Sequence, residues 1–395
     1  MCSVKPFGIA FLFCLLCSVY SCDKLDGGSD EDSGSGGTGG GGAYVRENLS
    51  ENGSANCYIV SSAGEYRFKA VKGNSTESVG QIDSVCVLWE TYGTDYAPRK
   101  KDLIAEVGID DDYIIFRTPE TFRKGNALIA VMDPEGTVLW SWHIWLTDRP
   151  EDQIYNNGAG IIMDRNLGAI SASKGDVGAL GLLYQWGRKD PFLNSSSISE
   201  CVVAKSTLVW PGAVVSSRIT GTIEYATANP TQFIGANENN YDWMYFPTMN
   251  TENFGWSSKK TIYDPCPVGY HVPDGGPYGM WAVALGTESL ENNLTETADN
   301  TNKGFDLGGL SGTTYKLTDA DVCWYPFSGC RDSNGRLAQV GEIGNYASWS
   351  RDMIIEPHGT NHVTNYYFSI WGNDGMCTSS KSFKAKGLSV RCVKE

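Results

Sequence analysis

Short runs of alternating apolar and polar residues, each closed by turn residues, fill the chain from residue 44 to residue 150 and restrict this part to strands. In EYRFKAVKG, Tyr66 and Phe68 alternate with charged residues, as a sheet with one solvent-exposed face requires. The apolar runs VCVLWE, DYIIFRT, ALIAVMD and TVLWSWHIWL follow, and DPEG at 133–136 supplies turn residues before the last of them. Because no helical period interrupts these runs, the segment predicts an all-β sandwich.

From residue 151 to residue 395 the sequence is rich in Gly, Asn, Ser and aromatic residues, and long irregular stretches separate its strands. VGALGLLYQWGR at 177–188 has apolar residues at helical spacing and predicts a short helix. GPYGMWAVALG at 276–286 predicts a second one. With strands expected at NYASWS, NYYFSIW and LSVRCV, this part predicts a single loop-rich α+β domain.

The N-terminus has the pattern of a bacterial secretory signal. Residues 1–21 hold one lysine and an apolar run too short to span a bilayer, and small residues precede Cys22. This ending resembles the lipobox of bacterial lipoproteins, with Val19 in place of the usual leucine, and the resemblance implies lipid on Cys22. Several acyl chains such as palmitate hold a protein stably at a membrane, whereas one chain is marginal. Ordinary secretion is the alternative.

Residues 22–43 predict a disordered tether, because they offer almost no apolar side chain to bury. With about 20 flexible residues the tether spans about 25 Å, enough to lift a folded domain off the lipid headgroups. Its acidic cluster, Asp30 to Asp32, resembles the export signal of lipoproteins of the Bacteroidetes type, which implies an outer-membrane position facing the cell exterior. A plain soluble spacer is the alternative.

The chain is acidic, with a formal net charge of −15, and its sequence has no basic patch that would displace counterions from phosphates. Nucleic acid is therefore not expected as a partner. The 41% of hydrophobic residues, with 12 Trp and 20 Tyr, are ample for packed cores. The sequence contains no Walker loop, dinucleotide fingerprint, HExxH motif, nucleophile elbow or kinase signature, so we expect a binding protein and not an enzyme.

Eight cysteines remain once the signal is removed and Cys22 is lipidated, and this even number suits an exported protein with disulfides. Spacing alone does not give their connectivity. No CxxC pair occurs and the histidines lie apart from the cysteines, which argues against structural zinc. The eight are Cys57, Cys86, Cys201, Cys266, Cys323, Cys330, Cys377 and Cys392.

Five blocks in order across residues 154–395 resemble the signature of the Fibrobacter major paralogous domain (FISUMP). They are MDRNLGA at 163–169, GLLYQWGRKDPF at 181–192, YDPCPVGYHVP at 263–273, NYASWS at 345–350 and GLSVRCVK at 387–394. The segment before them resembles the N-terminal module of surface lipoproteins described as fimbrium-tip or adhesin-like. The resemblance implies a cell-surface location, a C-type-lectin-like or formylglycine-enzyme-like fold, and no established reaction. Tyr270 and Cys330 depart from the pattern, where the family usually has tryptophan and an aromatic residue, respectively.

In a lectin-like domain the first and last strands meet, so the resemblance implies a Cys266–Cys392 disulfide. Two further pairings follow in descending order: Cys377 with Cys323 or Cys330, and Cys57 with Cys86. Either of these two could instead remain as free thiols. The SVRCV ending also resembles formylglycine-generating enzymes, but such a catalyst would need a reactive Cys392 instead of a bonded one.

A faint calcium-site pattern lies near the C-terminus. Calcium-dependent lectins carry Glu-Pro-Asn in one loop and Trp-Asn-Asp shortly before a cysteine, which together supply hard oxygen ligands. Here His358 replaces the asparagine, and Gly372 separates Trp371 from Asn373, so the GNDG sequence is favoured as a hairpin turn over a calcium site. As a hypothesis, the ligand contacts are Glu356, Asn361, Trp371, Asn373 and Asp374, and the weak calcium candidates among them are Glu356, Asn373 and Asp374.

Other polar residues are expected to have structural roles. The clusters 164–166 and 188–190 could be imagined as active-site groups, but ion pairs and turn contacts are the favoured interpretation. His143 lies in a tryptophan-rich strand and is expected to pack or to form hydrogen bonds. His358 and His362 lack the helix that would make their spacing a metal site.

The sequence thus predicts an all-β immunoglobulin-like sandwich at 44–150, followed by a C-type-lectin-like (formylglycine-enzyme-like) α+β domain at 151–395. The expected function is adhesion or binding at the cell surface, with an extracellular glycan or host glycoprotein as ligand. A structural subunit of a fimbrium, in contact with other fimbrial subunits, is the alternative. No cofactor is expected, apart from the weak calcium candidate.

Overall fold

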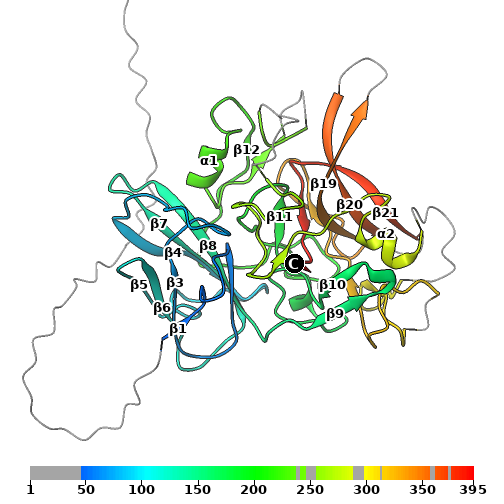
Figure 1. The fold of residues 1–395 in the computed structure, drawn as a ribbon, viewed down its shortest axis with the longest axis horizontal. Coiled ribbons are helices and arrows are strands. Elements are labelled where there is room, and N and C mark those ends of the chain that lie inside the picture. Colours follow the sequence, from blue (N-terminus) through cyan, green and yellow to red (C-terminus); the bar gives the residue numbers. More distant parts are fainter. Residues whose placement is uncertain are drawn as a thin grey trace, which may run out of the picture. The chain divides into compact units, whose positions relative to one another are not determined.

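The computed structural model describes residues 46–236, 241–245, 255–287, 298–311, 314–355, 361–371 and 375–395, with the backbone alone at 353–355 and 361–363. These residues belong to one compact unit and are mostly strands, with two short α-helices in the described ranges (Figure 1). The β-rich class predicted from the sequence is therefore confirmed. Within the same ranges, no helix is both long and apolar enough to span a membrane.

The first part of the described chain forms two four-stranded sheets, one with the order β1-β3-β6-β5 and one with the order β2-β8-β7-β4 (Figure 1). The strands are β1 (Glu47–Asn48), β2 (Cys57–Val60), β3 (Glu65–Lys69), β4 (Ser84–Thr91), β5 (Glu106–Asp110), β6 (Tyr113–Arg117), β7 (Gly125–Met132) and β8 (Val138–Leu146). The predicted alternation is present in β3, where Tyr66 and Phe68 are buried and Lys69 is exposed.

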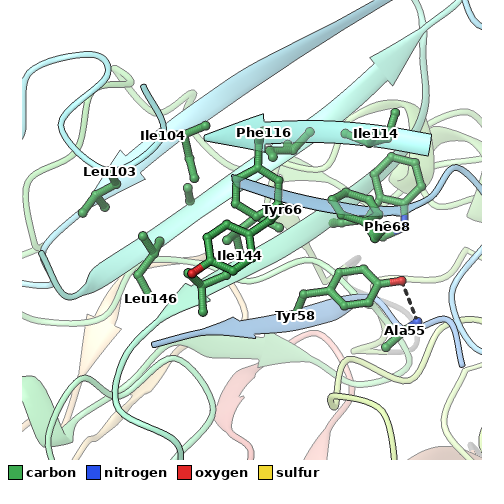
Figure 2. Packing of buried hydrophobic residues seen from close by; sticks show 14 of the residues in the cluster. Ala55, Tyr58, Tyr66, Phe68, Leu103, Ile104, Ile114, Phe116, Ile144 and Leu146 are labelled. Carbon is green, nitrogen blue, oxygen red and sulfur yellow. Dashed lines mark hydrogen bonds between the residues drawn. The ribbon is translucent and has the colours of Figure 1, made fainter. Parts of the chain in front are cut away.

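Side chains from both sheets form one core (Figure 2). The ring of Phe68 in β3 lies 4.6 Å from the ring of Tyr58 in β2 and 5.2 Å from that of Trp142 in β8, measured between centroids. Each such ring removes about 150–250 Å² from water, and at about 25 cal/mol per Å² this burial stabilises the fold by several kcal/mol. The two sheets therefore pack face to face.

The second part forms four further sheets within the described residues. The largest has the order β18-β17-β22-β19-β20-β21, with β11 paired to β22; the others are β14-β23-β10-β9, β12-β13 and β15-β16. The strands are β9 (Asp152–Tyr155), β10 (Gly160–Met163), β11 (Leu183–Gln185), β12 (Val214–Val215), β13 (Ile234–Gly235), β14 (Tyr270–His271), β15 (Gly304–Asp306), β16 (Trp324–Pro326), β17 (Cys330–Arg331), β18 (Leu337–Ala338), β19 (Ile343–Ile355), β20 (Asn361–Trp371), β21 (Gly375–Phe383), β22 (Gly387–Ser389) and β23 (Val393–Lys394). The helices are α1 (Ile223–Ala228), α2 (Met280–Leu285) and the 3-10 turns η1 (Asn156–Gly158) and η2 (Val177–Ala179).

One of the two predicted helices is present. Helix α2 confirms the prediction at 276–286, and it ends at Gly286, whose φ of 72° lies in the left-handed region. The helix predicted at 177–188 is wrong, because the segment forms η2 and then β11. Gly181 has a φ of 70°, which interrupts a right-handed helix, and β22 then supplies hydrogen-bond partners for the backbone of β11.

The start and the end of the second part meet, as the family resemblance implies. Ile162 of β10 pairs with Val393 of β23, and β23 also pairs with β14. Next to β23, Cys266 and Cys392 form a disulfide with a Cα–Cα distance of 5.9 Å. The predicted Cys266–Cys392 bond is therefore confirmed.

The two further disulfide pairings are not formed, which is the alternative that the sequence left open. Cys57 lies in β2 and Cys86 in β4, the two edge strands of one sheet. Three strand spacings of about 4.8 Å place them about 14 Å apart, beyond the limit of about 7 Å for a disulfide. Cys377 lies in β21, and β19 and β20 run between it and Cys330. Cys323 is buried in a separate core, where its sulfur lies 3.3 Å from the hydroxyl of Tyr155.

Buried hydrogen bonds join the first two sheets to the chain beyond residue 150. Asn126 Nδ2 donates to Gly168 O at 2.9 Å, and Trp145 Nε1 donates to Ala169 O at 2.9 Å. Because the amide nitrogen of Asn126 is used in this way, its Oδ1 accepts from His143 Nε2 at 2.8 Å. Burial lowers the pKa of His143 to about 3, so this histidine is neutral and structural at ordinary pH, as expected.

Candidate functional site

Of the five predicted ligand contacts, the structure describes Asn361 and Trp371, and it places them far apart. Asn361 begins β20 and Trp371 ends it, and ten residue steps of about 3.3 Å separate their backbones by about 33 Å. Glu356, Asn373 and Asp374 lie outside the described residues. Asn361 and Trp371 therefore do not belong to one compact site, because the pattern in sequence runs along the full length of a strand.

Strands β20 and β21 pair antiparallel on either side of the GNDG stretch, whose residues 372–374 lie outside the described residues. Trp371 pairs with Gly375, and the antiparallel register of β20 and β21 continues from there. Within the described residues, no group of three or more His, Cys, Asp or Glu side chains is placed to hold a metal ion.

The two polar clusters form structural ion pairs, as expected. Arg165 donates from Nε and Nη2 to the two carboxylate oxygens of Asp164, each at 2.8 Å, and its guanidinium also reaches Asp148 at 3.0 Å. Such bidentate pairs fix geometry. Lys189 and Asp190 are buried against Ser141, and Arg188 donates to Gln185 Oε1 at 2.8 Å.

The described residues form a cleft of about 930 Å³, here called the β2 cleft. It is bounded by β1 and the turn after it, by β2, by the turn at 74–76, and by residues close to the disulfide and the C-terminus. These segments are far apart in sequence, and the two sheets and the β14-β23 pairing bring them together. The volume falls within the range of about 300–1,000 Å³ that is typical of small-ligand sites.

One wall of the cleft is an open strand edge. Strand β2 runs parallel to β8, and its Asn56 and Val60 carbonyls accept from His143 N at 2.8 Å and Thr147 N at 2.9 Å. In a parallel ladder successive residues direct their N–H and C=O to opposite sides, so the backbone of Ile59, the residue before Val60, faces away from β8. Among the described residues, the bridge between Cys57 and Pro267 is the one pairing on that side.

A second wall is a polar turn held in place by hydrogen bonds. Ser75 N donates to Ser54 Oγ at 2.9 Å, which ties the turn at 74–76 to the chain before β2. Asn74 adopts a left-handed φ of 58°, and its Nδ2 donates to Thr261 O at 2.6 Å. Its Oδ1 is buried without a hydrogen-bond partner in the described structure. A buried unpaired acceptor is costly unless water or a ligand supplies a donor.

Two lysines of the opposite rim, Lys260 and Lys394, are already paired. Lys260 donates to the carbonyls of Cys266 at 3.0 Å and Pro267 at 2.9 Å and holds this loop from the inside. Lys394 and Tyr270 both bond Asp152, at 2.6 Å and 2.5 Å. Burial acts to raise the pKa of Asp152, but the bonds from Lys394 and Tyr270 outweigh this effect and lower it.

The lining gives the cleft a mixed chemistry. Asn48, Asn52 and Thr76 offer neutral donors and acceptors, while Leu49 and Val268 add apolar surface. The thiol of Cys57 also lies here, but burial raises its pKa, so little of it is a nucleophilic thiolate. This arrangement can hold a neutral polar ligand that also presents apolar patches.

Sequence reasoning missed the β2 cleft because its residues have the composition of ordinary turns. Asn, Ser, Gly and Thr in ENGSAN and GNST predict chain reversal and carry no signal of a shared site. Only the parallel pairing of β2 with β8 and the closure of the C-terminus onto β14 bring them together. Comparison with known proteins finds no family model, no curated protein and no solved structure that matches this chain.

Proposed function

We propose that this chain is a lipoprotein of the outer-membrane surface that binds carbohydrate or host glycoprotein in the β2 cleft. The observation that supports this best is that amides and hydroxyls of the cleft lining stand beside apolar surface, with Glu47, Glu51 and Arg149 adding charge. Sugars present both hydroxyls and apolar faces, and sites for such ligands combine apolar surface with a few placed polar groups. Asn48, Asn52 and Thr76 offer donors and acceptors for sugar hydroxyls.

The proposal includes the architecture that the sequence favours. The first two sheets would be an immunoglobulin-like sandwich, and the part after residue 150 would be a lectin-like domain of the FISUMP type. The bonded state of Cys392 supports binding over a formylglycine-type reaction, because that chemistry needs a reactive thiol. No calcium is required at the β2 cleft, so the ligand should remain bound in EDTA.

A glycan array tests the binding site. The fragment from residue 44 should bind a set of glycans, and Thr76→Trp should weaken that binding at least about tenfold, which corresponds to about 1.4 kcal/mol. Thr76 is exposed and lines the cleft, so the indole fills space that a ligand needs. Thr121→Trp is the matched control, since Thr121 is exposed and lies outside the cleft. Equal loss in both variants, or loss in neither, would remove the β2 cleft as the glycan site.

Labelling with radioactive palmitate tests the anchor. Wild-type protein expressed in a bacterium that processes lipoproteins should take up label, and Cys22→Ala should take up none, because residue 22 would carry the acyl chains. Protease treatment of intact cells should then remove the wild-type protein from the cell surface. Equal labelling of both forms would exclude lipidation at Cys22.

A fimbrial subunit is the second candidate, and the open edge of β2 favours it. An extended segment of a neighbouring subunit could pair with the backbone around Ile59, as in β-strand addition. In that case the array would show no glycan binding, and Thr76→Trp would instead prevent co-purification of a partner subunit.

A further inference from the structure

Cys201 lies in a small ordered loop on the surface. Ser195 and Val203 form an isolated bridge that closes this loop, here called the Cys201 loop (residues 195–203). Inside it, Ser195 Oγ donates to the carbonyls of Glu200 at 2.5 Å and Val202 at 3.0 Å. Cys201 is therefore exposed but held in a defined position.

The Cys201 loop packs on the segment that follows β18. A β-carbon at Gly341 would lie 2.7 Å from both Ile198 O and the Cα of Ser199, so the two backbones are in direct contact there. Gly341 N is itself fixed by a 2.8 Å bond to Phe327 O. The Cys201 loop therefore contacts Gly341 through Ser199, which lies two residues before Cys201.

Cys330 lies in a strand that contacts the same segment. It pairs with Ala338 across the β17-β18 hairpin, and a β-carbon at the preceding Gly329 would lie 2.7 Å from Val340 N. Residues 338–341 therefore contact both the strand that holds Cys330 and the loop that holds Cys201. The thiol of Cys330 is buried and donates to Gln339 Oε1 at 3.8 Å.

The electrostatics of Cys330 agree with this proximity. Burial raises the pKa of the Cys330 thiol to about 11, Lys386 opposes the rise, and Asp332 and Cys201 add to it. The contribution of Cys201 is the smallest of the four, and it is consistent with a Cys201 loop that lies close to β17. Cys377, the other partner considered for Cys330, is kept away by β19 and β20.

We propose that Cys201 and Cys330 form a second disulfide, which fastens the Cys201 loop to β17 once the chain meets a disulfide oxidant. The inference depends on export from the cytoplasm but not on the identity of the ligand. The exposed Cys201 thiolate attacks one sulfur of the oxidant's disulfide and releases the other sulfur as a thiol. The Cys330 thiolate then attacks the Cys201 sulfur and releases the second thiol. Two electrons and two protons pass to the oxidant, which is reduced to two thiols.

Peptide mapping of the full-length chain tests the proposal. The protein is treated with oxidised glutathione, its remaining thiols are blocked with N-ethylmaleimide, and it is digested with trypsin. We expect peptide 190–205 joined to peptide 317–331, with a mass two hydrogens below the sum of the two. Because peptide 317–331 contains both Cys323 and Cys330, fragmentation must place the bond on Cys330. Labelling of Cys201 should disappear on oxidation and return with dithiothreitol.

Three variants provide the controls. Cys201→Ser changes an exposed residue, so it should fold normally, lose the joined peptide and leave Cys330 open to alkylation after denaturation. Cys330→Ala should also lose the joined peptide, while Cys377→Ala should retain the joined peptide. A stable glutathione adduct on Cys201, full labelling of Cys201 after oxidation, or a bond to Cys323 or Cys377 would each overturn the proposal.

Discussion

Replacing both Cys266 and Cys392 by alanine is expected to lower the free energy of unfolding by about 2–5 kcal/mol. The disulfide joins residues that are 126 positions apart, so its loss frees a long loop in the unfolded chain. Both cysteines are fully buried, and their backbones are already held, since Cys266 N donates to Asp264 Oδ1 at 2.9 Å and Met163 N donates to Cys392 O at 3.1 Å. The native contacts should therefore persist, and most of the effect should arise in the unfolded state.

Urea denaturation with and without dithiothreitol measures this loss. The double variant should unfold at lower urea than wild type in the absence of reductant, and the difference should vanish when wild type is unfolded in dithiothreitol. A single variant, Cys392→Ala, should behave like the double variant but carry a reactive thiol at Cys266. Identical midpoints in oxidising buffer would contradict the prediction.

The elements that the sequence predicted correctly depend on local patterns. The period of two in EYRFKAVKG places Tyr66 and Phe68 inward in β3, and a one-residue shift would expose both. The short helix α2 follows from its own apolar residues and the glycine that ends it. The Cys266–Cys392 bond was predicted from a family resemblance that implied a meeting of the first and last strands, and the pairing of Ile162 with Val393 brings those strands together here.

The elements that the sequence missed depend on long-range pairing. The leucines around Leu180 have helical spacing, but Gly181 with positive φ and pairing with β22 override it. Cys57 and Cys86 fail to pair because strand order, which spacing does not encode, places them at opposite edges of a sheet. The β2 cleft could not be predicted from the sequence for the same reason. The parallel pairing of β2 with β8 and the pairing of β23 with β14 assemble it from turn residues.

Asp190→Ala is expected to lower the free energy of unfolding by about 3–5 kcal/mol, because it leaves a buried ammonium group without its counter-charge. Lys189 Nζ lies 2.7 Å from Asp190 Oδ1, and the two side chains are 2% and 4% exposed. Ser141 Oγ donates to the same carboxylate oxygen at 2.6 Å. In the variant, the Lys189 ammonium group would still contact Ser141 O, at 3.0 Å, and the ring of Trp140, whose centroid lies 4.6 Å away. Neither of these partners carries a full negative charge.

The pH dependence of this loss separates an unpaired charge from a cavity. Burial lowers the pKa of Lys189, and Asp190 opposes this shift, so its removal should lower the folded-state pKa further. A lysine with a lowered folded pKa binds fewer protons when folded than when unfolded. Stability therefore rises as pH approaches the unfolded lysine pKa of about 10.4. The deficit of Asp190→Ala relative to wild type should shrink between about pH 7 and pH 10.

The paired variant Lys189→Met/Asp190→Asn is the matched control. It removes both charges, keeps an oxygen that can accept from Ser141, and leaves no ammonium group to desolvate. Replacing a buried ion pair by neutral groups of similar volume is often close to neutral. The control should therefore unfold at higher urea than Asp190→Ala. Its stability should not rise between about pH 7 and pH 10 in the way expected for Asp190→Ala. If Asp190→Ala unfolds like wild type, or if the control is equally destabilised at every pH, then Asp190 does not balance the charge of Lys189.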